Sequence, residues 1–325
     1  ISFMTYIKIS HGAWGRYDIE VTGQDDIDAT GQREFTPQEF IQLFNRAEFG
    51  RLFHPDGIEG TRLLTGELTS NCNLREPREA CRYGNEKLVF LGDSYVGHLE
   101  RAVLDTLGRK EFGFISMSYD QCPFVTDQIW FGDNAECPYV NEERRAIITS
   151  FSDQKIFVIS LNEHQFGIAK ERTANPLNDG RRKQKAGTPV DPEIAWNSYF
   201  ESINWLLEQG HKVVLIRSLP MTHLDAQKWL GENIEYVKDM NFPQIYNTEK
   251  PRDVIEIDNN RYPEFDPKSV LTIDPAVIFC VKKTNLCVDI LKDYGPLYNS
   301  DRHLSYLGSA LLASKIKEGI LQRGW

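Results

Sequence analysis

The architecture of this chain can be read from one segment, Lys87-Leu88-Val89-Phe90-Leu91-Gly92-Asp93-Ser94. The four consecutive apolar residues are typical of a buried strand, and Gly92 ends the run. Apolar residues then recur at helical spacing, at Val96, Leu99, Val103 and Leu107. The segment therefore predicts a strand, a tight turn and a helix, with Ser94 at the start of the helix.

The segments that follow repeat this alternation. The apolar runs predict strands over 112–117, 155–161 and 211–219. Helical periods predict helices over 142–151 with Asn141 as cap, over 191–210 with Asp191-Pro192 as start and Gly210 as end, and over 305–323. Strands that alternate with helices indicate an α/β fold, a doubly wound, flavodoxin-like parallel sheet with helices on both faces.

The length of 325 residues exceeds one average domain. Residues 1–86 are polar and irregular, and we expect them to form an N-terminal extension; residues 87–325 form the α/β body. Two further stretches, 163–190 and 240–276, are predicted to be long loops because they are rich in Gly, Pro and charged residues.

The charge and the hydropathy pattern exclude two classes of protein. Lys and Arg number 37 against 47 Asp and Glu, which gives a formal charge of −10 and argues against nucleic acid as the main partner. No apolar run approaches the roughly 20 residues needed to cross a bilayer. The chain begins at Ile1 without an initiator Met, so we expect a cut piece or a mature chain.

The six cysteines fall as three pairs of near neighbours: Cys72 with Cys81, Cys122 with Cys137, and Cys280 with Cys287. None has the C-x-x-C spacing of a zinc site, so no metal site is predicted. Three local disulfides in an oxidising compartment are the favoured interpretation, although other connectivities are possible. The alternative is six reduced core thiols in a cytosolic protein.

Ser94 and His303 are the candidate catalytic pair. In an open parallel sheet the site lies at the carboxyl ends of the strands, where Ser94 would expose its hydroxyl and its helix-terminal amide could stabilise an oxyanion. A serine nucleophile needs a base, and His303 precedes the last helix at the same edge of the sheet. The competing interpretations are that Ser94 only caps its helix and that His303 is structural; His164 is the alternative base.

These residues resemble a known family. Leu91-Gly92-Asp93-Ser94 is similar to the first sequence block of the SGNH hydrolases, and His303-Leu304-Ser305 followed by Gly308 is similar to the last block of one subgroup. That subgroup is the SGNH domain of bacterial acyltransferase-three fusion proteins, which O-acetylate envelope glycans. The resemblance extends over roughly residues 87–321. It implies that residues 87–325 form an SGNH-like catalytic domain and that residues 1–86 form a linker from a membrane domain.

The resemblance also implies residue roles. Ser94 becomes the nucleophile and one oxyanion donor, and His303 becomes the base. Asn162 in Ser160-Leu161-Asn162-Glu163 becomes a second oxyanion donor; the alternative is that it only caps a turn. The family's oxyanion glycine has no clear counterpart, because Gly113 falls within the second predicted strand, so an amide within 118–120 is the substitute. The family usually has an aspartate three residues before the base, and here that position holds Ser300. Three possibilities remain: Asp301 orients His303, another carboxylate orients it, or Ser94 and His303 act as a dyad without a carboxylate.

The function implied is that of the periplasmic domain of a membrane O-acyltransferase. An acetyl group would pass through an acyl-serine to a hydroxyl of an envelope polysaccharide such as lipopolysaccharide O-antigen. No bound cofactor is expected, and the acetyl donor, derived from acetyl-CoA, would arrive through the chain's own N-terminal transmembrane acyltransferase domain at the periplasmic face of the inner membrane. The fragment is expected to be monomeric. A carbohydrate acetyl-esterase and a degenerate glycan-binding module are the alternatives.

The basic cluster 181–185 is either a solvated loop or a contact for anionic glycans or lipid headgroups.

Overall fold

A computed structural model of the chain describes residues 58–69, 72, 76–130, 134, 136–160, 170–171, 188–220, 222, 224–233, 236, 241–249, 262–281, 286–299 and 303–325. All of these residues belong to the same unit of the chain, Ile41–Trp325.

The main sheet has seven strands in the described part of the chain, in the order β1-β2-β4-β3-β6-β9-β11. Their bounds are β1 Arg62–Leu63, β2 Cys81–Tyr83, β3 Leu88–Gly92, β4 Phe114–Ser118, β6 Ile156–Ile159, β9 Lys212–Ile216 and β11 Val270–Ile273. The strands from β4 to β11 pair in parallel, and β1 and β2 extend that sheet antiparallel beyond β4. In chain order the parallel strands run 2-1-3-4-5, so the predicted flavodoxin-like α/β fold is confirmed.

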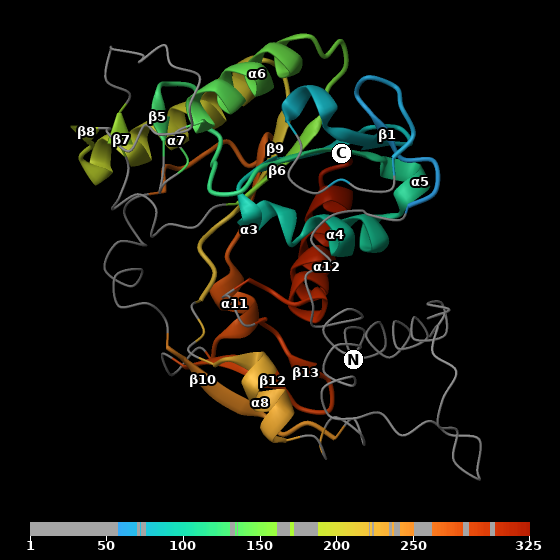
Figure 1. Ribbon diagram of the computed structural model, residues 1–325, viewed down its shortest axis with the longest axis vertical. Helices are drawn as coiled ribbons and strands as arrows, with labels where there is room; N and C mark the ends of the chain where they lie inside the picture. Colours follow the sequence, from blue (N-terminus) through green and yellow to red (C-terminus); the bar gives the residue numbers. More distant parts are fainter. Residues whose placement is uncertain are drawn as a thin grey trace. The chain divides into compact units, whose positions relative to one another are not determined.

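Helices cover both faces of the sheet (Figure 1). Helices α4 (Glu100–Leu107) and α12 (Tyr306–Gln322) lie together on one face, and α6 (Cys137–Thr149) and α7 (Pro192–Glu208) lie on the other. Val89 and Leu91 of β3 join the core cluster that contains Trp196 of α7. Because side chains alternate along a strand, Leu88 and Phe90 point to the opposite face, where α4 and α12 lie.

The remaining described elements surround this sheet. A short 3-10 helix and three short helices are η2 Pro77–Glu79, α3 Ser94–Gly97, α5 Arg109–Phe112 and α8 Ala226–Glu232. One small sheet contains β10 Ile245–Glu249, β12 Leu286–Leu291 and β13 Gly295–Pro296, with α11 Pro275–Phe279 nearby in sequence. Another contains β5 Ile129–Trp130, β7 Lys170–Glu171 and β8 Thr188–Pro189. Among the described residues, none of the helices is both long enough and apolar enough to span a membrane.

Three sequence expectations about elements were wrong. Helix α6 begins at Cys137, and Asn141 is a buried residue inside it instead of its cap, because Pro138 at the start of the helix already suits the first turn. Both predicted long loops contain strands: 163–190 contains β7 and β8, and 240–276 contains β10 and β11. Strand β11 is only four residues long and follows proline-rich sequence, so the pattern of the surrounding residues concealed it.

All three predicted disulfides are present. They join Cys72 to Cys81, Cys122 to Cys137, and Cys280 to Cys287, and no cysteine of the described residues is free. Two of these disulfides lie at the main sheet: Cys81 is the first residue of β2, and Cys122 lies in the loop that follows the carboxyl end of β4.

Candidate active site

The turn that carries Ser94 is shaped by a glycine and an aspartate. Gly92 ends β3 with a φ of +150°, and a Cβ added there would lie 2.9 Å from the carbonyl oxygen of Ser160. Asp93 then caps α3, since its Oδ1 accepts a hydrogen bond from the amide of Tyr95 at 2.8 Å. Ser94 is the first residue of α3 and is partly exposed. The chain thus turns sharply from strand to helix and leaves the Ser94 hydroxyl accessible.

His303 lies in the segment before α12. Its carbonyl accepts a hydrogen bond from the amide of Asn299 at 2.9 Å. Ser305 caps α12, and its Oγ also donates to the carbonyl of Pro296 at 2.8 Å. The Nε2 atom of His303 lies 2.8 Å from Oγ of Ser94, within hydrogen-bonding distance. The fold therefore brings together the two residues that the sequence singled out, 209 positions apart.

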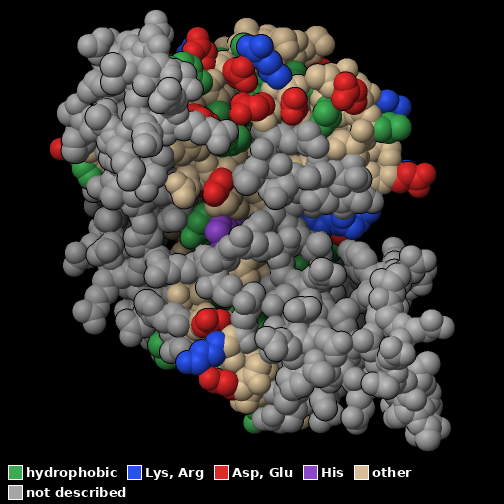
Figure 2. Space-filling model, in the orientation of Figure 1, with side chains coloured by type: hydrophobic (Ala, Val, Ile, Leu, Met, Phe, Trp, Pro, Cys, Tyr) green, Lys and Arg blue, Asp and Glu red, His purple; other side chains and the backbone are tan. Residues whose placement is uncertain are grey.

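Two buried rings of the nucleophile segment contact the imidazole of His303. The ring of Tyr95 lies 4.9 Å from it in a tilted arrangement, and the ring of His98 lies 5.6 Å away, edge to face. Burial, and then the neighbouring His303, holds the pKa of His98 well below its usual range. Sequence reasoning gave neither residue a role, although their spacing from Ser94 places them close to it. In Figure 2, the purple of a histidine side chain lies in a hollow on the side of the molecule in view.

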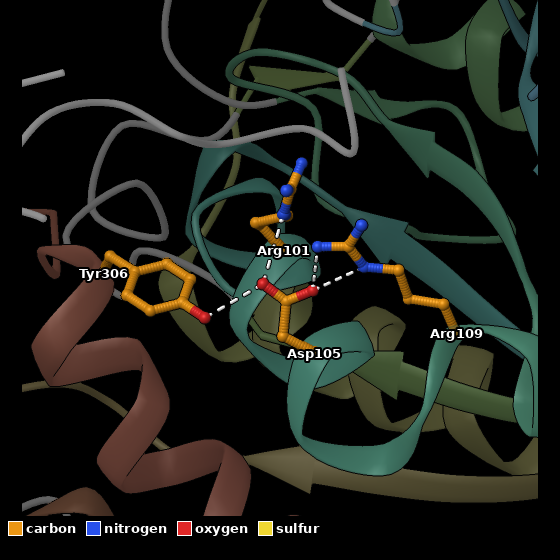
Figure 3. A network of polar contacts seen from close by, with 4 residues as sticks. All are labelled: Arg101, Asp105, Arg109 and Tyr306. Carbon is orange, nitrogen blue, oxygen red and sulfur yellow. Dashed lines mark hydrogen bonds and ion pairs between the residues drawn. The ribbon is translucent and has the colours of Figure 1, made fainter. Parts of the chain in front are cut away.

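A polar network ties the helix after the nucleophile to the helix after the base (Figure 3). Tyr306, the first residue of α12, donates its hydroxyl proton to Oδ2 of Asp105 in α4 at 2.9 Å. Asp105 also accepts from Nε of Arg101 at 3.2 Å and from Nε of Arg109 at 2.6 Å. Because Tyr306 follows His303 by three residues, this network limits how far the base can move from α4.

A buried carboxylate lies behind the carboxyl end of β4. Oε1 of Glu100, which has no exposed surface, accepts from the hydroxyls of Ser116 at 2.9 Å and Ser118 at 2.7 Å. Both serines lie on the side of the sheet that α4 covers. The bonds fix α4 against β4, and so they add to the rigidity of the edge on which Ser94 stands.

The other predicted site residues lie mostly outside the described residues. This applies to Asp301 and Ser300, to Asn162 and the alternative base His164, and to the cluster 181–185. Of the amides suggested as substitutes in the oxyanion site, that of Tyr119 is engaged, since it donates to the carbonyl of Gly92 at 3.0 Å. Gly113 does not lie within the strand but directly before β4, as the C-cap of α5.

The described residues contain no group of three or more His, Cys, Asp or Glu side chains that could hold a metal ion. The amide of Ser94 makes no hydrogen bond to any described residue. The geometry brings a hydroxyl within hydrogen-bonding distance of an imidazole nitrogen, beside the amide at the start of α3.

No curated protein sequence matches this chain. Among solved structures, it is similar to the periplasmic domain of a lipopolysaccharide acetyltransferase from Salmonella ser. Paratyphi A, with 14% sequence identity, a TM-score of 0.48, and coverage of 73% of this chain and 85% of that chain. The model of the family described as SGNH domain (fused to AT3 domains) matches residues 67–318. This match extends over most of the sequence, so the chain belongs to the family of SGNH domains that are fused to AT3, or acyltransferase-three, domains.

Proposed function

We propose that this chain is the acyl-transferring domain of a membrane O-acyltransferase, with Ser94 as nucleophile and His303 as general base. The observation that carries the proposal is the 2.8 Å contact between Oγ of Ser94 and Nε2 of His303. A serine hydroxyl is a weak nucleophile until a base within hydrogen-bonding reach accepts its proton. Membership of a family fused to AT3 domains supports acyl transfer as the class of reaction.

The proposed reaction has two halves. In the first, Oγ of Ser94 attacks the carbonyl carbon of the acyl donor while Nε2 of His303 accepts the hydroxyl proton, and the protonated imidazole then gives this proton to the leaving group. In the second, a sugar hydroxyl passes its proton to His303 and attacks the acyl-serine, and Ser94 leaves and regains a proton. General base catalysis of this kind contributes about 10²- to 10⁴-fold in rate.

The oxyanion formed in both halves needs hydrogen-bond donors. The backbone amide of Ser94 and the side-chain amide of Asn162 are the proposed donors, and the loss of one such donor typically costs about 10²- to 10³-fold in rate. Asp301 is the proposed partner that orients His303. We further propose that the acyl group is acetyl, that no cofactor is held by this domain, and that the donor arrives through a membrane domain of the same protein at the periplasmic face of the inner membrane. The proposed acceptor is a hydroxyl of an envelope polysaccharide such as O-antigen.

Labelling with a fluorophosphonate tests the nucleophile. The wild-type protein should form an adduct on Ser94, and Ser94→Ala and His303→Gln should react at least about 10²-fold more slowly, because labelling requires an activated hydroxyl. Ser150→Ala is the matched control, since this serine lies exposed at the end of α6 and, within the part of the chain that the structure describes, its hydroxyl bonds only to the carbonyl of Ile147. Wild-type protein that reacts no faster than Ser94→Ala would leave a glycan-binding module as the better interpretation.

A second labelling experiment tests the proposed role of Asp301. If Asp301 orients the imidazole, Asp301→Asn should slow labelling substantially; in a serine protease the corresponding change costs about 10⁴-fold in kcat. An unaffected rate would indicate a Ser–His dyad.

Incubation with an activated acetyl ester and candidate oligosaccharides, followed by mass spectrometry, distinguishes transfer from hydrolysis. Acetylated sugar supports transfer, whereas free acetate alone would favour a carbohydrate esterase.

A further inference from the structure

Arg144 is an arginine in α6 with no surface exposed to solvent. A buried guanidinium is costly unless its N–H groups find acceptors and its charge is compensated. Its neighbour Arg145 is only partly buried, although the two residues are adjacent in the sequence. Of these two arginines, the fold buries Arg144. The hydrogen bonds of its guanidinium show which parts of the backbone it connects.

The two terminal nitrogens of Arg144 use all of their protons. Nη2 donates to the carbonyl of Gly92 at 2.8 Å and to the carbonyl of Met117. Nη1 donates to the carbonyl of Cys122 at 2.9 Å and to Oδ1 of Asn141 at 2.8 Å. Gly92 ends β3 and Met117 lies near the end of β4, so one side chain connects the carboxyl ends of two neighbouring strands to the loop that the Cys122–Cys137 disulfide closes.

The charge of Arg144 is also directed at the nucleophile turn. Burial lowers the pKa of its guanidinium to about 9, while the nearby Asp93, and then Tyr119, act in the opposite direction. At neutral pH the guanidinium keeps its proton, and its positive charge interacts electrostatically with the nearby Asp93. That carboxylate is the cap of α3, since it accepts the amide of Tyr95.

We propose that Arg144 is a positioning residue that holds Ser94 in reach of His303. It does so by fixing the carbonyl of Gly92, two residues before the nucleophile, and by stabilising the Asp93 cap next to it. The amide of Tyr119 donates to the same Gly92 carbonyl at 3.0 Å, so that carbonyl is held from two sides. The inference rests on the proposed function, because its consequence is the reactivity of Ser94.

The test compares Arg144→Lys and Arg144→Met with Arg145→Met. Lysine keeps a positive charge but cannot reach four acceptors in the fixed geometry of a guanidinium. The control removes an arginine of the same helix that donates to the carbonyl of Thr126 at 3.0 Å and lies over the ring of Trp205, and that makes no hydrogen bond to β3 or β4 among the described residues. The measurements are the fluorophosphonate labelling rate, and kcat and KM for an activated acetyl ester, on protein whose fold is checked by circular dichroism.

Both Arg144 variants should show labelling rates and kcat lowered by about 10²-fold with KM within about twofold, because a misplaced reacting group lowers the rate of the chemical step and not ester binding. Arg145→Met should stay within about twofold of wild type in all three quantities. A folded Arg144→Lys with wild-type labelling would overturn the inference, and so would an equal loss in Arg145→Met.

A milder variant decides the question if neither Arg144 variant folds. Asn141→Ala removes one of the two oxygen acceptors of Nη1 and the 2.9 Å bond from Nδ2 of Asn141 to the carbonyl of Pro123. The guanidinium that holds the carbonyls of Gly92 and Met117 is then less firmly fixed. This variant should lower the labelling rate by about tenfold, and an unchanged rate would overturn the inference. Wild-type protein that resists labelling as Ser94→Ala does would instead defeat the proposed function, so the two failures are distinguishable.

Discussion

Gly308, in the first turn of α12, offers a direct test of whether backbone packing sets the contact between Ser94 and His303. A Cβ added at Gly308 would lie 2.2 Å from the carbonyl oxygen of Leu297, and real Cβ atoms essentially never approach within 3.0 Å. The atom in the way belongs to the backbone, so no side chain can rotate to relieve the contact. That carbonyl also accepts the amide of Ser305 at 2.9 Å, two residues after His303.

The size of the displacement follows from these distances. In Gly308→Ala, the segment around Leu297 and the start of α12 must separate by about 0.8 Å, as overpacked backbone does. A movement of this size along the line joining Oγ of Ser94 and Nε2 of His303 would lengthen their 2.8 Å contact to about 3.6 Å, which is no longer a hydrogen bond. A misplacement of about 1 Å can cost about 10²-fold in rate.

Stability should change far less than reactivity. Overpacking costs about 1–3 kcal/mol, and the better helix propensity of alanine offsets about 1 kcal/mol of this. The expected net loss of about 0–2 kcal/mol lowers Tm by at most about 8 °C. The assay is the rate of fluorophosphonate labelling at Ser94, measured well below Tm. The matched control is Gly319→Ala in the same helix, whose new Cβ would meet the side chain of Leu271 at 2.4 Å.

The two variants separate geometry from general loosening. Gly319→Ala should lose stability to a similar extent and keep a labelling rate within about twofold of wild type. If Gly308→Ala labels at the wild-type rate, the packing of α12 against Leu297 does not set the position of His303. If both variants lose reactivity equally, the loss comes from reduced stability, and the geometric reasoning is refuted.

Three more predictions concern the surroundings of the site. Tyr306→Phe removes the 2.9 Å bond to Asp105 and should lower the free energy of unfolding in urea by about 1 kcal/mol; an unchanged midpoint would contradict a stabilising role for this network. Burial holds the pKa of His98 below its value in the unfolded chain. As the pH falls below about 6.5, this histidine therefore binds a proton in the unfolded chain before it does so in the native state. This contribution to stability is fully present above this pH and is lost below it, by up to about 1.4 kcal/mol per pH unit. In urea titrations between pH 7.5 and 5, His98→Phe should show a weaker dependence of the free energy of unfolding on pH. Identical slopes for the two proteins would contradict this role of His98. Replacing Cys122 and Cys137 together by Ala opens a loop closed over 15 residues and should cost about 3 kcal/mol by the same measurement, whereas a wild-type midpoint would show that the loop is held without the disulfide.

Some elements of the fold follow from local sequence and others do not. The apolar runs at Leu88–Gly92, Ile156–Ile159 and Lys212–Ile216 predicted their strands because each is long enough to stand out from its neighbours. Helix α7 was predicted at both ends, since Asp191 caps it and proline suits its first turn. Strand β11 was missed because the polar Thr272 interrupts its apolar residues and prolines precede it, whereas β6 is an unbroken apolar run of the same length; pairing with β9 makes it a strand.

The sequence by itself determined the type of sheet, the cysteine pairs, the family resemblance and the two candidate reacting groups. These are properties of short segments, and each depends on composition or spacing over fewer than about 20 residues. Even so, the sequence could place Ser94 and His303 only at the same edge of the sheet.

Only the tertiary structure decided the 2.8 Å distance between those groups, the rings of Tyr95 and His98 against the imidazole, and the burial of Arg144. In the sequence, Arg144 and Arg145 are indistinguishable members of a charged run, Glu142-Glu143-Arg144-Arg145. Which of them enters the interior depends on how α6 lies over the ends of β3 and β4. Contacts of this kind join segments far apart in the chain, so they are set by the relative placement of whole elements and leave no periodic signal in the sequence.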